Sequence, residues 1–194
     1  MEQKDKWRDT GKDVRKMITA QIVSFLMTAA GLLGGIGELM SWNEKISVEL
    51  ISDLLFLAAT GVFLIFLLRR NLLLFRIANF LAAVAMGMIF ALLADYCLFG
   101  EDLPPSSLLF LGIPSALCAI AGLLAGGKGI TPASKAMIFL AAVIRGVLGV
   151  FDGSLLLAGI ASWDFDWETL SSFFSLGTAV MYINMAVYMH KTCS

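Results

Sequence analysis

The stretch from Leu72 to Leu98 reads LLLFRIANFLAAVAMGMIFALLADYCL. A helix that crosses the hydrocarbon core of a bilayer needs about 20 mainly apolar residues, and this stretch exceeds that length. Its only charged residues are Arg76, near the start, and Asp95, near the end. The stretch therefore predicts a membrane-spanning helix, and the bilayer as the solvent of the chain.

The composition of the whole chain leads to the same prediction. Of 194 residues, 59% are hydrophobic and only 15% are charged, which is unlike an ordinary water-soluble domain. A net charge of −1 provides no basic field for nucleic acid, so we exclude that partner. One histidine and three scattered cysteines do not form the usual metal, haem or disulfide patterns, and we expect no metal and no other cofactor.

Six apolar runs of spanning length divide the chain, separated by short polar breaks. The runs are Met17–Met40, Leu50–Leu68, Leu72–Leu98, Ser107–Ala125, Ala136–Ile160 and Thr169–His190. The predicted fold class is an all-α integral membrane protein with six transmembrane helices. Its domains would be a basic segment over residues 1–16, a six-helix transmembrane domain over 17–190 and a tail over 191–194.

The charged residues predict the orientation of these spans. Of the 14 basic residues, all except Lys45 and Arg145 flank the first span, the second break, the fourth break or the end of the last span. The other three breaks are acidic and contain Glu44, Glu49, Glu101, Asp102, Asp164, Asp166 and Glu168. Since Lys and Arg concentrate on the cytoplasmic side, both termini should be cytoplasmic.

An internal repeat predicts how the spans are grouped. Phe80-Leu81-Ala82-Ala83-Val84-x-x-Gly87 recurs 59 residues later as Phe139-Leu140-Ala141-Ala142-Val143-x-x-Gly146. We interpret this as three tandem helical hairpins, about 17–70, 71–127 and 134–190, all inserted the same way up. The first, third and fifth spans would then take equivalent places around a common centre. Generic Leu- and Ala-rich membrane composition is the competing explanation.

Each of these odd-numbered spans carries one carboxylate in its outer part. Glu38, Asp95 and Asp152 are spaced by 57 residues and again by 57. Charged side chains within spans usually face a bundle interior or water. Three equivalent carboxylates would form an acidic vestibule that opens outward, where mutual repulsion and partial desolvation would make protonation sensitive to mild acid. The alternative is three hydrated charges near the outer headgroups.

Arg145 lies deeper in the fifth span. Asp152 follows it by seven residues, on nearly the same helical face, but seven residues rise about 10.5 Å. A direct contact would therefore need a bridging water or a carboxylate from another helix. Arg145 is either part of an anion or proton pathway, or a side chain whose long stem reaches the cytoplasmic headgroups.

Uncharged polar and small residues predict how the helices associate. The polar residues within spans, expected to hydrogen-bond helices together, are Gln21, Asn79, Ser115, Ser175, Thr178, Tyr182 and Asn184. Gly149-x-x-x-Gly153 favours close helix contacts, within the chain or between subunits, and we expect a homo-oligomer. Pro114 should bend the fourth span near Phe110, because it removes a backbone donor.

One segment resembles a known family. Ile144-Arg145-Gly146-Val147-Leu148-Gly149-Val150-Phe151-Asp152-Gly153, with an arginine and spaced glycines early in a helix of a tandem hairpin, is similar to the HdeD-like acid-resistance membrane proteins. The resemblance covers residues 17–190. It implies a six-helix protein of the bacterial inner membrane linked to acid stress, and it provides no catalytic residues. The acidic outward breaks and the single prolyl loop at Pro104-Pro105 depart from the family.

These observations support two predictions of function. The first is a multi-pass inner-membrane protein associated with acid or membrane stress, whose outward acidic vestibule responds to protons. The second is a small channel, or a substrate-binding membrane subunit of a transporter, for a small solute or cation. No GxSxG, HExxH, P-loop or GxGxxG motif occurs, so we expect no enzymatic activity. The expected partners are the lipid bilayer and a second copy of the chain or other membrane subunits.

Overall fold

The computed structural model describes residues 11–42, 48–98, 108–162 and 167–192, and every regular element in these ranges is helical. The elements are α2 (Gly11–Trp42), α3 (Val48–Arg69), α4 (Leu72–Leu98), the π-helical turn η1 (Leu108–Gly112), α5 (Ile113–Lys128), α6 (Pro132–Ser162) and α7 (Trp167–Thr192). Six helices in this part of the chain are long and apolar enough to cross a membrane. The prediction of an all-α protein with six apolar spans is confirmed.

The observed helices differ from the predicted spans mainly at their ends. Helix α4 has the predicted bounds, whereas α2 begins at Gly11 and α6 at Pro132, each several residues early. Helices extend past the apolar run because polar side chains at a membrane surface are hydrated and do not interrupt the backbone hydrogen bonds of the helix. Several predicted features lie outside the described residues: residues 1–10 of the basic segment, residues 193–194 of the tail, and Glu44, Glu101, Asp102, Asp164 and Asp166.

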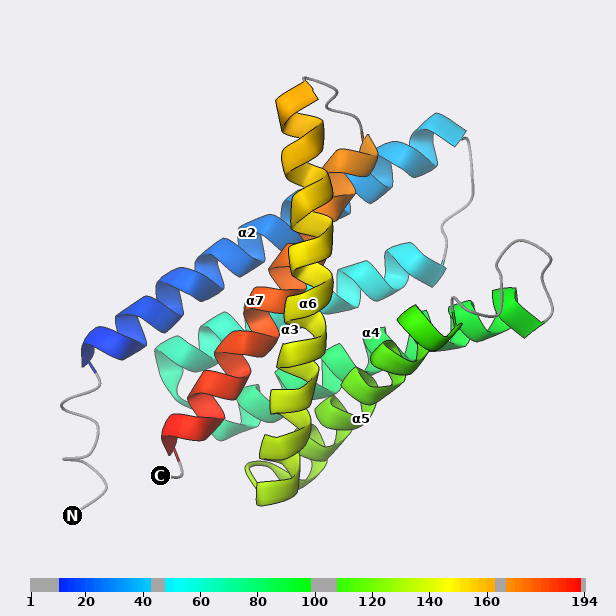
Figure 1. Ribbon diagram of the computed structural model, residues 1–194. Helices are drawn as coiled ribbons and strands as arrows, with labels where there is room; N and C mark the ends of the chain where they lie inside the picture. Colours follow the sequence, from blue (N-terminus) through cyan, green and yellow to red (C-terminus); the bar gives the residue numbers. More distant parts are fainter. Residues whose placement is uncertain (1–10, 43–47, 99–107, 163–166, 193–194) are drawn as a thin grey trace, which may run out of the picture.

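The six helices form a closed ring in chain order (Figure 1). Each helix packs on the next one, and α7 packs on α2 to close the ring. Helix α3 packs more extensively on α4 than on α2, so the contacts do not divide the ring into three pairs. Within the described ranges, α2, α4 and α6 make no backbone contact with one another. The three-hairpin arrangement stays a prediction.

Two tight turns connect the helices at one end of the ring. Between α3 and α4, Arg70 adopts a left-handed conformation with φ of 53°, and the Asn71 side chain accepts a hydrogen bond of 3.0 Å from the backbone N–H two residues on, which caps α4. Between α5 and α6, Thr131 and Ser134 exchange hydrogen bonds of 2.8 and 3.1 Å between backbone N–H and side-chain oxygen. Such reciprocal capping determines where α6 begins.

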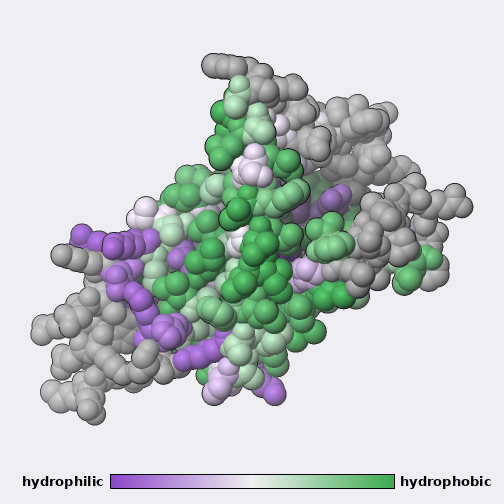
Figure 2. Space-filling view, in the orientation of Figure 1, coloured by the Kyte–Doolittle hydropathy of each residue, from purple (hydrophilic) through white to green (hydrophobic). Residues whose placement is uncertain are grey.

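The first and last described helices meet at the same end. Lys191 Nζ lies 2.6 Å from Asp13 Oδ2, and Figure 1 places both tight turns on that side of the ring. Figure 2 shows hydrophilic residues gathered there and a hydrophobic surface over the middle of the visible face. The start of α2 and the end of α7 thus share one side of the bundle. That this side is cytoplasmic stays a prediction.

A polar seam joins α2 to α3 and α7. Gln21 Nε2 donates to the Thr60 carbonyl at 3.1 Å, Asn184 Nδ2 donates to Gln21 Oε1 at 3.2 Å, and Ser24 Oγ donates to the Gly177 carbonyl at 2.7 Å. All of these side chains are buried. The association of helices through buried polar side chains, predicted for Gln21 and Asn184, is present here.

Small residues allow close packing within the chain. A β-carbon at Gly149 would lie 2.9 Å from Cβ of Ala179 on α7, and one at Gly153 would lie 3.2 Å from the Leu176 side chain. Of the two interpretations of the Gly149-x-x-x-Gly153 motif, the structure therefore supports contacts within the chain. An oligomer would need another surface.

Pro114 lies just after an irregular turn. Residues Leu108–Gly112 form the π-helical turn η1 immediately before α5. Proline has no N–H to donate to the residue four positions earlier, which is Phe110, and its ring crowds that carbonyl. A widened turn relieves both problems. The turn η1 lies at the position where a bend was predicted, near Phe110, and the bend itself stays a prediction.

Candidate functional site

Among the described residues, one cation reaches into the interior of the ring. Arg145, near the middle of α6, directs its guanidinium across the ring, and Nη2 donates to Sδ of Met86 on α4. Met86 is fully buried. Arg145 Nε is also buried and has no hydrogen-bond partner among the described residues. The guanidinium therefore lies inside the bundle, and not at the headgroups.

Two further side chains surround this cation. Tyr182 on α7 is fully buried, packs its ring 6.0 Å from that of Phe56, and has a hydroxyl without a hydrogen-bond partner in the described part of the chain. Cys118 on α5 is buried as well. The charge of Arg145 acts electrostatically on both groups. Four helices thus contribute Met86, Cys118, Arg145 and Tyr182 to one cluster, which we call the central cluster.

The central cluster has unused hydrogen-bonding capacity. A buried polar group without a partner costs about 1–3 kcal/mol, and more when it is charged. Guanidinium offers only donors, and a phenol hydroxyl can also donate. Arg145 Nε and the Tyr182 hydroxyl are therefore suited to an anionic or hydrogen-bond-accepting group. No three His, Cys, Asp or Glu side chains gather as possible metal ligands among the described residues.

The structure does not bring the predicted vestibule residues onto Arg145. In the described ranges Arg145 forms no ion pair with Asp152, which is half-buried on the same helix. Asp95, near the end of α4, is exposed. Glu38 lies in α2, but its side chain is outside the described part of the structure. Convergence of the three carboxylates stays a prediction, and no backbone contact between their helices supports it.

Sequence analysis missed one carboxylate. Asp53 lies in the second turn of α3, is half-buried, and its Oδ2 would be 3.8 Å from a β-carbon at Gly35 of α2. Asp53 follows Glu49 by four residues, so both share a helical face. The spacing of four residues from Glu49 was the sequence signal that could have identified Asp53, because it places a second carboxylate on the same helical face, one turn further into the apolar span.

The roles of Tyr182 and Cys118 were also underestimated. The sequence predicted that Tyr182 hydrogen-bonds helices together, but its hydroxyl has no hydrogen-bond partner among the described residues. Cys118 has no motif around it that assigns a role. Only the crossing of α5, α6 and α7 brings them to Arg145.

Comparisons of the chain with known protein families, with curated proteins and with solved structures give no match. The resemblance to the HdeD-like family therefore depends on the sequence pattern alone, and the functional argument depends on the geometry described above.

Proposed function

We propose that this chain is a small channel, or the substrate-binding membrane subunit of a transporter, and that the central cluster binds the solute. The solute carries an anionic or hydrogen-bond-accepting group. Six apolar helices provide the membrane domain, and Arg145 provides the recognition element.

The observation that carries this proposal is the buried, incompletely paired guanidinium. An arginine at the centre of a span costs about 2.5–3.5 kcal/mol on insertion scales. The partners of Arg145 among the described residues are sulfur atoms, the thioether of Met86 and the thiol of Cys118, and sulfur is a weak acceptor. Such partners do not offset the cost, so stability does not account for an arginine here. A ligand that accepts hydrogen bonds from Arg145 Nε and from the Tyr182 hydroxyl would account for it.

The positive charge of Arg145 restricts which solutes the central cluster can bind. Sequence analysis left a small solute or a cation open for a transport function. A fixed guanidinium repels cations and attracts anions in a low-dielectric interior. We therefore favour a small anion, or a neutral solute with a carbonyl or hydroxyl group, over a cation at this point of the pathway.

Flux measurements in proteoliposomes test the proposal. Chloride, nitrate, formate and acetate are the probes, each measured by stopped-flow light scattering against protein-free vesicles. Wild type should accelerate the entry of at least one probe, and Arg145→Gln should lower that rate by about tenfold, because a charged hydrogen bond is worth about 1.5–3 kcal/mol. Arg69→Gln, an exposed residue at the end of α3, is the matched control. Equal rates for wild type and Arg145→Gln contradict the proposal.

A second candidate is the acid-stress function with a proton-sensitive outer vestibule. The observation that favours it is the partial burial of Asp53 and Asp152 in the outer parts of α3 and α6. Protonation of a half-buried carboxylate removes a charge that is costly within the apolar layer. Acid would then change the packing of the outer helix ends. The two candidates differ in the residue required, since the first needs Arg145 and the second needs the carboxylates.

The remaining attributes belong to the same proposal. We place the chain in a bacterial inner membrane with both termini cytoplasmic, on the basis of the distribution of Lys and Arg. It acts without enzymatic activity, as a homo-oligomer or with other membrane subunits.

A further inference from the structure

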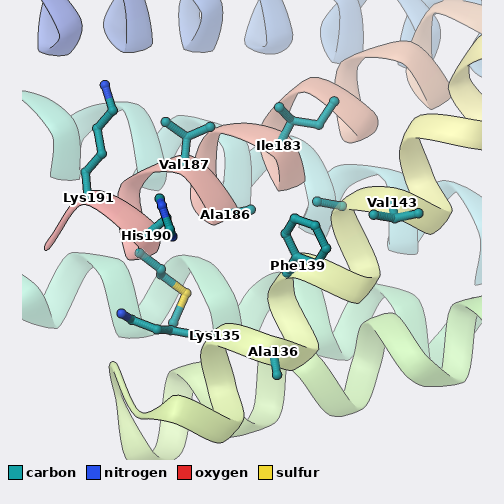
Figure 3. A pocket seen from close by; sticks show the side chains of 11 residues that line it. Lys135, Ala136, Phe139, Val143, Ile183, Ala186, Val187, His190 and Lys191 are labelled. Atoms are coloured by element: carbon teal, nitrogen blue, oxygen red, sulfur yellow. The ribbon is translucent and has the colours of Figure 1, made fainter. Parts of the chain in front are cut away.

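A groove runs between α6 and α7 on the outside of the ring, at the end where Lys191 pairs with Asp13 (Figure 3). Its volume is about 650 Å³. The walls are apolar, and one mouth carries basic side chains. Phe139, Val143, Ile183 and Val187 line its length, and two lysines and the histidine of the chain line its mouth: Lys135, Lys191 and His190.

The groove separates charge from apolar surface along its length. Helices α6 and α7 run antiparallel, so the first turn of α6 and the last turn of α7 place their basic residues together at one mouth, as Figure 3 shows. No acidic side chain lines the groove. Lys191 Nζ is held at 2.6 Å by Asp13, so contacts to an anion at the mouth fall mainly to Lys135.

We propose that the groove binds one anionic glycerophospholipid of the membrane leaflet at this end. An acyl chain lies along Phe139, Val143 and Ile183, and the phosphate of the headgroup lies against Lys135 and His190. Basic pockets between transmembrane helices on the cytoplasmic side are suited to such headgroups. This end is the one that the charge pattern predicts to be cytoplasmic.

Both parts of the groove are needed for this choice of ligand. A free phosphate ion would use the basic mouth and leave the apolar walls unexplained. Phe139 is 65% exposed and Val143 is 48% exposed, so the walls offer open apolar surface to an acyl chain of the bilayer. A second copy of the chain would cover the walls, but the acidic residues predicted on this side, such as Asp13, are outnumbered there by basic ones. A lipid that joins a phosphate to an alkyl chain satisfies both.

Native mass spectrometry of the delipidated full chain tests the proposal. Equal concentrations of phosphatidylglycerol and phosphatidylcholine with the same acyl chains are the probes. Wild type should retain one phosphatidylglycerol in clear preference to phosphatidylcholine. Lys135→Gln should reduce that preference about fivefold, because one basic residue near an anionic headgroup is worth about 1 kcal/mol. Lys128→Gln, exposed at the end of α5 and outside the groove, should keep the wild-type preference.

Additional arms separate the alternatives. Val143→Trp fills the groove and should lower the retention of both lipids, whereas Val147→Trp, one turn further along α6 and outside the groove, should not. Lys135→Arg should restore the preference if Lys135→Gln lost only a charge. The proposal is overturned if Lys135→Gln and Lys128→Gln behave alike, if inorganic phosphate displaces phosphatidylglycerol, or if Val143→Cys cross-links to a second copy where lipid should lie.

Discussion

Nη2 of Arg145 donates to Sδ of Met86, and these two residues occupy the same place in the two copies of the repeated segment. The copies begin at Phe80 and Phe139, and the two residues follow them by six positions each. The flanking residues agree in burial, since Ala82 and Ala141 are buried while Phe80 and Phe139 are exposed. Equivalent faces of α4 and α6 therefore point into the ring, where one copy presents a thioether and the other a guanidinium.

The same register separates two of the predicted acidic positions. When the two copies of the repeated segment are aligned, Asp95 corresponds to Ser154. Asp152 lies two residues before that equivalent position. Two residues are about 200° around a helix. This explains why Asp95 is exposed while Asp152 is half-buried, and it weakens the argument that the acidic positions are equivalent.

Replacing Arg145 by methionine, the residue at its equivalent position, should separate stability from function. An apolar side chain of similar length removes the desolvation cost of the cation and can pack against Met86. Replacement of buried ionic groups by apolar ones is often neutral or stabilising. We expect an unchanged or raised Tm in detergent, measured by thermal unfolding, together with loss of the flux that wild type supports. A lowered Tm would mean that Arg145 serves the fold, and Met86→Leu controls for repacking.

Gly177 should be sensitive to substitution because of the close approach of α2 and α7. A β-carbon at Gly177 would lie 2.7 Å from the backbone nitrogen of Thr28 and 2.8 Å from the carbonyl oxygen of Ser24. Since backbone atoms cannot turn aside, Gly177→Ala should lower the free energy of unfolding by about 1–3 kcal/mol. Gly87→Ala is the control, because a β-carbon there meets nothing within 4 Å. Equal losses for both variants in denaturant unfolding would contradict the close-packing argument.

The cap at Asn71 should stabilise the turn between α3 and α4. Asn71→Ala removes the acceptor for the backbone N–H of Leu73 and should cost about 1 kcal/mol. Asn71→Asp keeps an acceptor and should retain most of the wild-type stability. Unfolding in mixed micelles measures both. If alanine and aspartate lower stability equally, the side-chain cap is not what holds the turn.

Replacing Asp152 should change stability more than replacing Asp95. Asp152 is half-buried and Asp95 is exposed, so Asp152→Asn removes a charge that is costly within the apolar layer. We expect a larger rise in Tm at neutral pH for Asp152→Asn than for Asp95→Asn, measured by thermal unfolding in detergent. Equal Tm changes for the two variants would contradict the argument from burial.

The combined variant Glu38→Gln, Asp95→Asn, Asp152→Asn tests the vestibule as a unit, and Asp53→Asn tests the additional carboxylate of α3. A triple variant that titrates like wild type would show that the three residues are ordinary outer charges.

Both termini should be on the cytoplasmic side of the membrane. A reporter fused after Ser194, or a label within residues 1–16, should report the cytoplasm, because all basic residues except Lys45 and Arg145 flank the predicted inner ends. The ion pair of Asp13 with Lys191 requires the start of α2 and the end of α7 to lie on the same side of the membrane. Labelling from opposite sides would disprove the pairing, and labelling of both from outside would reverse the topology.

The number and nature of the helices were determined by the sequence alone. In hydrocarbon every backbone N–H and C=O must be satisfied within its own segment, so an apolar run of spanning length becomes a helix whatever its neighbours. Leu72–Leu98 is therefore found with its predicted bounds, and the effect of Pro114 appears one turn before it, because a proline acts on its own backbone.

The surroundings of each charge were decided only by the tertiary structure. Which face of a span meets another helix depends on crossings that the apolar pattern does not encode, because lipid and protein interiors are equally apolar and the outward face carries no polar signature. Arg145 meets Met86 across the ring, Asp53 lies against Gly35, and Gly149 packs on Ala179. Each contact joins residues far apart in the chain, so no local spacing predicts it.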